Sequence, residues 1–441
     1  MHRGHNAPGF YRRKHAFKLQ MNRDSTEFDS TAIPENQRQH WVGIAAVAVM
    51  VSLSVPTFVT GVELSATMGA ESLITAVILG SAIIFVIGAM TGYVGARTGL
   101  NSYLLARVAF GDKGAACVNT AFALSLMGWF GINLNLFGHA ATELIGHLIE
   151  PSPPPILLTV AATLGITITT LIGFKAIHRL SLLLTPPLLI IFLMLCGATE
   201  WPNASADVLF SSRDSDWSSG VSTTVGSIII GAIIMPDVTR FLRNASSAIT
   251  VALLAFMCAQ PAVMIVAGLA SQSMAAQDLN TLMLSLGMGS AALLLIMASS
   301  WILNALNLYS AALGLRASLP IPNPSLLIAS TAAIGLVAGA SNILAIFLDY
   351  LFYLSIVFVP VAGVVIADFF VVRRSQYIGA AFKHRRTVRV TALSSWGGGA
   401  IYALLATEDF ILSLTGIAAL DSLVLSGAIF LILSHMTLDR T

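Results

Sequence analysis

The stretch Gly128-Trp129-Phe130-Gly131-Ile132-Asn133-Leu134-Asn135 lies in the middle of an apolar segment over roughly residues 116–147. A helix crosses the hydrocarbon core of a bilayer with about 20 apolar residues. Trp129 therefore falls near mid-membrane rather than at an interface, where tryptophan is usual. Asn133 follows one helical turn later and shares a face with Trp129. An aromatic plate beside an amide suits a flat, polar-edged ring. The alternative is helix packing through the glycines, with the amide bonding between helices.

The composition extends this local pattern to the whole chain. Of the 441 residues, 56% are hydrophobic and only 10% are charged, whereas a soluble protein carries about 25% charged residues. This predicts an all-α integral membrane protein of many spans. The sequence holds no His, Cys and carboxylate cluster with metal-ligand spacing, and no Gly-rich loop and lysine for nucleotide phosphates. We therefore expect neither an enzyme, nor a metal centre, nor an ATP-driven pump, and no cofactor.

The apolar segments predict twelve transmembrane helices. They lie at roughly 41–66, 71–95, 116–147, 155–174, 180–199, 221–239, 247–270, 282–312, 325–341, 344–369, 389–406 and 409–435.

The basic residues test that count, because Lys and Arg gather in cytoplasmic loops. With the amino terminus inside, only Arg213 of the 23 Lys and Arg falls in a predicted outer loop. This predicts a multi-pass protein of the cytoplasmic membrane with both termini in the cytoplasm. Residues 1–40 are expected to form a flexible cytoplasmic tail, and 41–441 the domain of twelve membrane helices.

Two of the spans carry residues that interrupt helices. The first contains Pro56 and Gly61, and the sixth contains Gly226 and Gly231. Transporters bind substrates where helices are broken at mid-membrane, although isolated Pro and Gly are also ordinary in membrane helices. The two spans occupy corresponding positions if two five-helix units repeat, the second inverted. That division places the repeats at about 41–199 and 221–369 and two extra helices at about 389–435.

Several sequence blocks then resemble the nucleobase:cation symporter-1 family, which includes bacterial cytosine permeases and their purine and allantoin relatives. Their order and spacing carry the resemblance, which covers nearly the whole chain after the tail. The blocks include Gly92 to Leu100, Gly128 to Gly131, Val225 to Ser227, Leu308 to Ala311 and Pro360 to Asp368. The resemblance implies the leucine-transporter fold, with two inverted five-helix repeats plus two extra helices. It also implies secondary active import of a nucleobase or related nitrogen heterocycle by alternating access.

In such families a flat base stacks on the tryptophan that matches Trp129. The resemblance implies that Asn133 helps to hold the ring and that Ser227 supplies a polar contact. Ile228 stands where cytosine permeases carry an aromatic residue, which places cytosine itself in question. On the eighth span Asn304 and Asn307 are spaced i and i+3, so both can face one groove, or else bond between helices.

The coupling ion is expected to be a proton. Sodium-coupled members of the family carry two adjacent hydroxyl residues where this chain has Ile302 and Leu303, so the sodium site is expected to be degraded. Intramembrane acids are functional candidates, here Glu63, Asp237 and Asp349. For Asp237, a salt bridge with the nearby Arg240 and Arg243 is the alternative.

Two other functions stay open: a sodium-coupled symporter of the same fold, and a carrier of a different small solute such as an amino acid. The expected partners are a small heterocyclic substrate and the lipid bilayer. No nucleic acid and no obligatory protein partner are expected.

Overall fold

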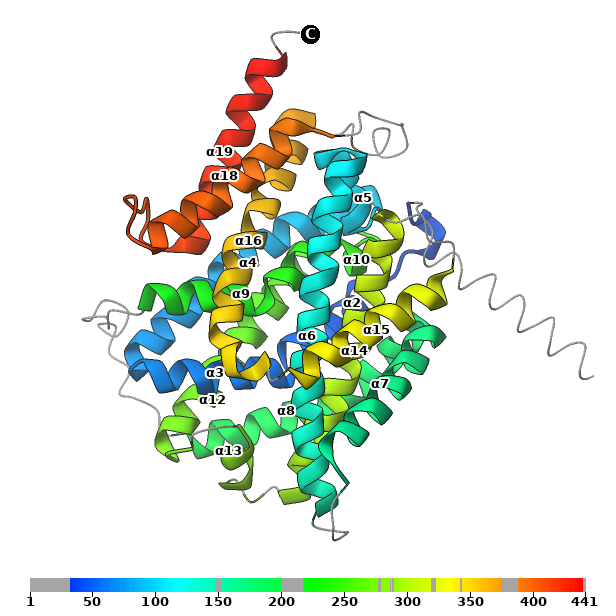
Figure 1. Ribbon diagram of the computed structural model, residues 1–441, viewed down its shortest axis with the longest axis vertical. Coiled ribbons are helices and arrows are strands. Elements are labelled where there is room, and N and C mark those ends of the chain that lie inside the picture. Colours follow the sequence, from blue (N-terminus) through cyan, green and yellow to red (C-terminus); the bar gives the residue numbers. More distant parts are fainter. Residues whose placement is uncertain are drawn as a thin grey trace, which may run out of the picture. The chain divides into compact units, whose positions relative to one another are not determined.

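A computed structural model describes residues 32–146, 153–199, 217–276, 279–285, 287, 289–318, 323–341, 343–373, 377 and 388–438. Apart from one isolated bridge between Gln39 and Leu242, the regular structure of these residues is helical (Figure 1). The predicted tail up to residue 31 and Arg213 lie outside the described residues.

The first half of the chain begins with the short η1 (Glu35–Gln37). It continues with α2 (Trp41–Ser52), α3 (Val55–Thr67), α4 (Ala70–Thr98), α5 (Ser102–Phe110), α6 (Asp112–Gly146), α7 (Pro155–Ile172) and α8 (Phe174–Ala198). The second half contains α9 (Trp217–Ile233), α10 (Pro236–Thr239), α11 (Ser247–Ala252), the π-helix η3 (Leu253–Ala259), α12 (Gln260–Ser273), α13 (Leu279–Ser285), α14 (Gly289–Ser318), α15 (Pro324–Ala340), η4 (Ile343–Ile346), α16 (Phe347–Ala367), the π-helix η5 (Asp368–Arg373), α18 (Val390–Thr407) and α19 (Ala418–Leu438).

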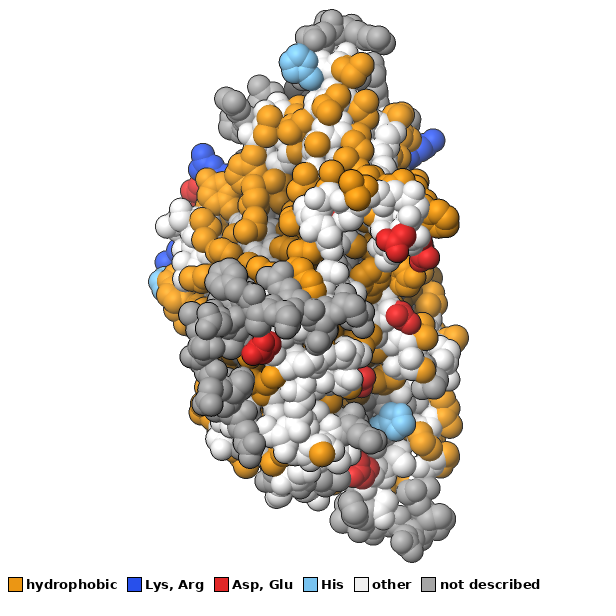
Figure 2. All heavy atoms as spheres, turned by 90° about the vertical axis from the view of Figure 1, so that its left-hand side faces the viewer, with side chains coloured by type: hydrophobic (Ala, Val, Ile, Leu, Met, Phe, Trp, Pro, Cys, Tyr) orange, Lys and Arg blue, Asp and Glu red, His pale blue; other side chains and the backbone are white. Residues whose placement is uncertain are grey.

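Nine helical segments within the described ranges are long and apolar enough to cross a membrane, and the stretches Leu182–Gly197 and Pro324–Ala340 form shorter apolar helices. Hydrophobic side chains cover much of the face seen in Figure 2, where charged side chains are few. The predicted all-helical membrane protein is confirmed. A helix lies within each of the twelve predicted ranges, while twelve membrane crossings and an inverted repeat stay predictions.

The first span is interrupted just before Pro56. Helix α2 ends at Ser52, and α3 starts at Val55 with Pro56 in its first turn, where a missing N–H costs nothing. The Val55 amide donates to Ser299 Oγ of α14 at 3.2 Å. A side chain from another helix therefore satisfies the backbone donor that the break exposes.

The sixth span is interrupted between α9 and α10. Because Pro236 has no N–H, the carbonyl of Ala232 loses the partner that a continuous helix would provide. Thr91 of α4 donates its hydroxyl to that carbonyl at 2.6 Å. The break at Ile234 and Met235 is thus stabilised by the neighbouring helix.

The glycines predicted to break these spans lie inside continuous helices, which corrects the sequence interpretation. A Cβ added at Gly61 would come within 2.3 Å of the Met264 carbonyl oxygen, and one at Gly226 within 1.6 Å of the Leu351 carbonyl oxygen. Gly231 is also within α9. Gly61 and Gly226 therefore permit close helix approach, and proline positions set the two breaks.

Residues 32–40, predicted as part of the flexible tail, are instead bonded to the helical domain. Ile33 N donates to Gly99 O at 3.0 Å, and Gln39 N donates to Phe241 O at 2.6 Å. Arg243 N in turn donates to Gln39 O at 3.1 Å. The segment before α2 is therefore held against the ends of α4 and α10.

A buried charge cluster joins the end of the tenth span to its neighbours. The fully buried Asp368 accepts from Arg389 Nη1 at 2.6 Å and from the Tyr377 hydroxyl at 2.8 Å, and lies 3.5 Å from Arg373 Nε. Arg373 also donates to the Val108 carbonyl of α5 at 2.7 Å. Burial, reinforced by Asp368, raises the pKa of Tyr377 well above its ordinary value. Two basic residues of the predicted inner loop between the tenth and eleventh spans therefore meet α5 and Asp368 at one end of the bundle.

Candidate functional site

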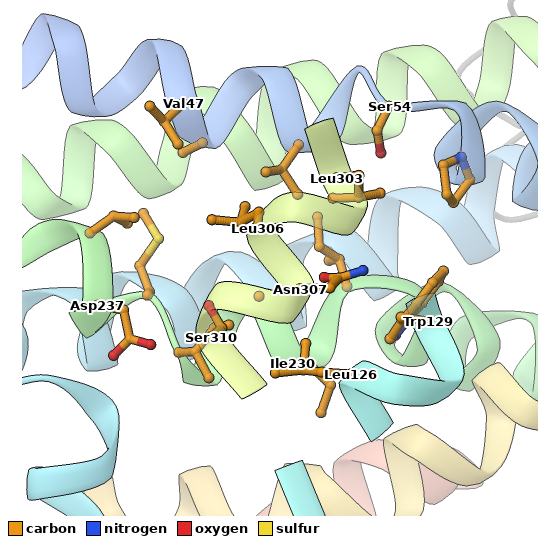
Figure 3. A pocket seen from close by; sticks show the side chains of 18 of the residues that line it. Val47, Ser54, Leu126, Trp129, Ile230, Asp237, Leu303, Leu306, Asn307 and Ser310 are labelled. Atoms are coloured by element: carbon orange, nitrogen blue, oxygen red, sulfur yellow. The ribbon is translucent and has the colours of Figure 1, made fainter. Parts of the chain in front are cut away.

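A cavity lies where the two interrupted helices meet α6, η3 and α14. It holds about 980 Å³ of empty space including its open mouth. Aliphatic side chains such as Leu126, Ile230, Leu303 and Leu306 make up much of its wall (Figure 3). Its polar side chains, besides the Trp129 indole, come from Ser54, Thr57, Ser227, Asp237, Asn307, Tyr309 and Ser310.

Trp129 of α6 lines this cavity and is 6% exposed. Its ring also meets two aromatic rings of α16 nearly edge to face, with centroids 6.2 Å from Phe347 and 5.9 Å from Tyr350. The Tyr350 hydroxyl donates to the Ser125 carbonyl at 2.7 Å, one turn before Trp129. Edge-to-face contacts are favourable, so α16 holds the indole in place against the cavity.

The glycines beside Trp129 serve packing, as the alternative interpretation expected. A Cβ at Gly128 would come within 2.7 Å of the Tyr350 hydroxyl, and one at Gly131 within 2.8 Å of the Gly339 amide of α15. Close approach of α15 and α16 therefore fixes α6 on both sides of Trp129. The glycines and the tryptophan have separate roles in the same stretch.

The structure brings Ser227, Ile228 and Asn307 to the same cavity as Trp129. The Nδ2 group of Asn307 is buried and has no partner among the described residues. In Figure 3 this amide nitrogen lies on the side nearer to Trp129, whereas Asp237 lies at the opposite end of the view. The cavity thus combines an aromatic plate with a nearby free amide.

Asn133 and Asn304 do not line the cavity, and both are fully buried. Asn133 Nδ2 donates to the Trp129 carbonyl of its own helix at 2.8 Å. Asn304 Nδ2 donates to the Phe130 carbonyl of α6 at 3.1 Å. In this conformation Asn304 links α14 to α6, as the packing alternative expected.

Only Asp237 of the three candidate acids lines the cavity. Its Oδ1 accepts from the amide and hydroxyl of Ser102 at 2.8 and 2.7 Å, and its Oδ2 has no partner in the described structure. Within these residues it forms no ion pair with Arg240 or Arg243, in contrast to the salt-bridge alternative. Glu63 is half-buried on α3 and Asp349 is exposed in the first turn of α16.

Sequence reasoning missed Ser54, Thr57 and Ser310 as wall residues and did not single out Gln260, whose amide donates to the Ser227 hydroxyl at 3.3 Å. Hydroxyl residues in a membrane helix commonly bond their own backbone, so their presence alone indicates no site. The proline at 261 was the available signal, because it follows Gln260 directly at the end of η3.

Comparisons with known proteins bear on the family and the fold of this chain. The family profile described as "permease for cytosine/purines, uracil, thiamine, allantoin" matches residues 32–422. Cytosine permease of Escherichia coli (strain K12) is 26% identical over 426 residues, which cover 94% of this chain and 95% of that protein.

Two solved structures of Mhp1, a nucleobase-cation-symport-1 family transporter, share the fold. The closed conformation with bromovinylhydantoin bound has a TM-score of 0.78 at 20% identity, covering 93% of this chain and 95% of that one. The inward-facing conformation has a TM-score of 0.77 at 19% identity and covers 93% of both chains. The chain therefore belongs to the family of permeases for cytosine, purines, uracil, thiamine and allantoin, the nucleobase:cation symporter family, and is a membrane transporter rather than an enzyme.

Proposed function

We propose that this protein imports a nucleobase or a related nitrogen heterocycle across the cytoplasmic membrane by secondary active transport. The observation that carries the proposal is Trp129 on the wall of a cavity bounded by both interrupted helices. A neutral ring stacks on the indole, and Ser227 and Asn307 bond to its edge. The E. coli cytosine permease supports the substrate class.

Tight contacts within two groups of helices support alternating access. In one group, a Cβ at Gly80 of α4 would come within 2.6 Å of Thr224 of α9, and one at Gly88 within 2.4 Å of the Phe256 ring of η3. In the other, a Cβ at Gly165 of α7 would come within 2.2 Å of the Trp301 ring of α14. Such packing resists internal rearrangement. We expect each group to move as a unit, with the cavity between them.

The cavity extends along α2 and α10, whereas α3 contributes only Pro56 and Thr57 to its wall. With both termini in the cytoplasm, as the basic loops predict, the α2 half of the first span faces inward. The conformation is then inward-facing. We further propose twelve crossings arranged as two inverted repeats, in keeping with the shared fold of Mhp1.

The proposed coupling ion is the proton. Asp237 is the candidate acid on the cavity wall, and a carboxylate can bind and release a proton there. Leu303, at one of the two hydroxyl positions of sodium-coupled relatives, lines the cavity with an aliphatic side chain, and Ile302 at the other is buried. Neither side chain has an oxygen for a hard cation such as sodium.

A ligand panel tests the substrate class. Cytosine, uracil, hypoxanthine, allantoin and, as a solute of another class, leucine are added to the purified protein in detergent, and the melting temperature is read. We expect stabilisation by at least one of the four heterocycles and none by leucine. Stabilisation by leucine alone, or by none of the five, would overturn the proposal.

Trp129→Ala then tests the site. Loss of base stacking costs about 1–3 kcal/mol, so the dissociation constant should rise by about 5- to 150-fold. Trp301→Ala is the matched control, because Trp301 packs on α7 and donates to Thr169 Oγ1 at 3.1 Å, outside the cavity wall. We expect Trp301→Ala to lower stability without changing affinity. Equal affinities of Trp129→Ala and the unsubstituted protein would reject the site.

Uptake into proteoliposomes tests the coupling. We expect accumulation driven by an inward proton gradient in sodium-free buffer, and its loss in Asp237→Asn while equilibrium exchange of substrate continues. Uptake that requires sodium and does not depend on the proton gradient would show that sodium, and not the proton, is the coupling ion.

A further inference from the structure

Gln260 lies behind the cavity wall and outside the residues that line it. It is fully buried and follows the π-helix η3 directly. Because Pro261 has no N–H, the backbone cannot continue a regular α-helical ladder here. The backbone N–H of Gln260 instead donates to the Ala255 carbonyl, five residues back. Short π-turns often occur at functional sites, and this one directly precedes a glutamine whose side chain contacts a residue of the cavity wall.

The Gln260 side chain bonds to Ser227, which does line the cavity. Its Nε2 group donates to Ser227 Oγ at 3.3 Å, while Ser227 Oγ donates to the Thr224 carbonyl at 2.7 Å. A hydroxyl has one proton and two lone pairs. The proton is committed to the backbone and one lone pair to Gln260. Ser227 is therefore left with a single acceptor position.

Asn307 complements that acceptor from α14. Asn307 lines the cavity, and its buried Nδ2 group has no partner in the described residues, so it is an unused donor next to the cavity. One acceptor and one donor on the wall match a ring edge that carries an N–H beside a carbonyl, as in a cyclic amide or ureide. Without the side-chain amide of Gln260, the Ser227 hydroxyl could point its proton into the cavity. The wall would then no longer offer one acceptor beside one donor.

The position of Gln260 is held by the packing of α12 on α3. A Cβ at Gly268 would come within 2.7 Å of the Gly61 carbonyl oxygen, and one at Gly61 within 2.3 Å of the Met264 carbonyl oxygen. The two backbones are thus in direct contact one turn and two turns beyond Gln260. The glutamine cannot withdraw from Ser227 without moving α12.

We propose that Gln260 is a specificity-determining positioning residue, which orients Ser227 as a hydrogen-bond acceptor for a ring N–H of the substrate. This inference rests on the proposed function and deepens it, because it assigns the chemical class of the bound edge. Gln260 acts through Ser227 and does not itself touch the substrate.

Gln260→Met tests the proposal, since methionine keeps the length of the side chain and lacks the amide. The probes are the tightest-binding member of the cytosine, uracil, hypoxanthine and allantoin panel and each of its mono-N-methyl derivatives. One neutral hydrogen bond corresponds to about a threefold to tenfold change in affinity. We expect Gln260→Met to lower the affinity for the parent heterocycle by that factor. Its affinity for the derivative methylated at the nitrogen that faces Ser227 should stay unchanged.

Two controls separate positioning from a structural effect. Gln272→Met removes a glutamine amide from the same helix; this amide donates to the Ser65 and Met68 carbonyls at 3.0 Å. The variant should still distinguish the parent heterocycle from its N-methyl derivatives. In a Ser227→Ala background, Gln260→Met should have no further effect on affinity, because its partner is gone. The melting temperature of Gln260→Met should not fall, since the variant removes a buried Oε1 that lacks a partner.

The outcomes distinguish this inference from the proposed function. Binding of no heterocycle by the unsubstituted protein would remove both. A different result would remove this inference alone: the unsubstituted protein binds a heterocycle tightly, and Gln260→Met loses affinity equally for the parent and for all its N-methyl derivatives. An additive effect in the Ser227→Ala background would do the same.

Discussion

Gly226→Ala is the perturbation that most directly tests the packing around the sixth span. Gly226 lies inside α9, and a Cβ there would come within 1.6 Å of the Leu351 carbonyl oxygen of α16 and 2.5 Å of its carbon. Real Cβ atoms essentially never approach closer than 3.0 Å. The two helices would have to separate by about 1.4 Å, and a backbone atom cannot rotate out of the way.

The expected cost follows from this geometry. Overpacking typically costs about 1–3 kcal/mol, and a clash with backbone places Gly226→Ala at the upper end of that range. The alanine regains about 0.5–1 kcal/mol of helix propensity, so we expect a net loss of about 2 kcal/mol. Gly231→Ala is the matched control on the same helix, because its nearest neighbour is the Ile228 Cγ1 atom at 3.2 Å, which can shift. We expect no loss of stability there.

Thermal unfolding of both variants in one detergent, with size-exclusion chromatography before and after heating, measures this difference. We expect a clearly lower melting temperature for Gly226→Ala and an unchanged or higher one for Gly231→Ala. Equal melting temperatures would refute the packing argument. An equal decrease in both variants would restore the interpretation that each glycine serves as a helix break.

Two further pairs of substitutions test the break in the sixth span and the buried charge cluster. Thr91→Val should cost about 1–3 kcal/mol in unfolding free energy, since it leaves the buried Ala232 carbonyl without its donor. Thr75→Val should be nearly neutral, because among the described residues the hydroxyl of Thr75 bonds only to the Glu71 carbonyl of its own helix; equal losses in both variants would contradict this assignment. Asp368→Asn should cost about 3 kcal/mol, the lower end of the range for breaking a buried pair, because it removes the buried charge that two half-buried arginines face. Asp112→Asn should stay within about 1 kcal/mol, since its ion pair with Arg107 is partly exposed, with side-chain exposures of 27% and 37%; chemical denaturation that ranks these two the other way would reject the role of the cluster.

Much of the fold was readable from the sequence, because a membrane imposes strong local constraints. Each span must supply its own backbone hydrogen bonds and enough apolar residues to cross the lipid. The helices therefore appear in the predicted ranges, and the first break lies within two residues of Pro56, as its fixed φ and missing N–H require. Trp129 could be singled out for the same reason, since a large polar-edged ring at mid-membrane is unusual.

The partners of each polar side chain and each glycine were set only by tertiary packing. Helical periodicity placed Asn133 and Trp129 on one face, yet the Asn133 amide bonds to the Trp129 carbonyl and does not reach the cavity. In the sequence, Gly226 is compatible both with a break in the helix and with a close contact between helices. Only the position of α16 in the structure shows that it makes a close contact. Pro261 marks an irregular turn at Gln260 but not a contact with the cavity wall, because the proposed role of Gln260 depends on a serine 33 positions away. Spacing along a helix determines which residues share a face, but only the neighbouring helix determines what that face meets.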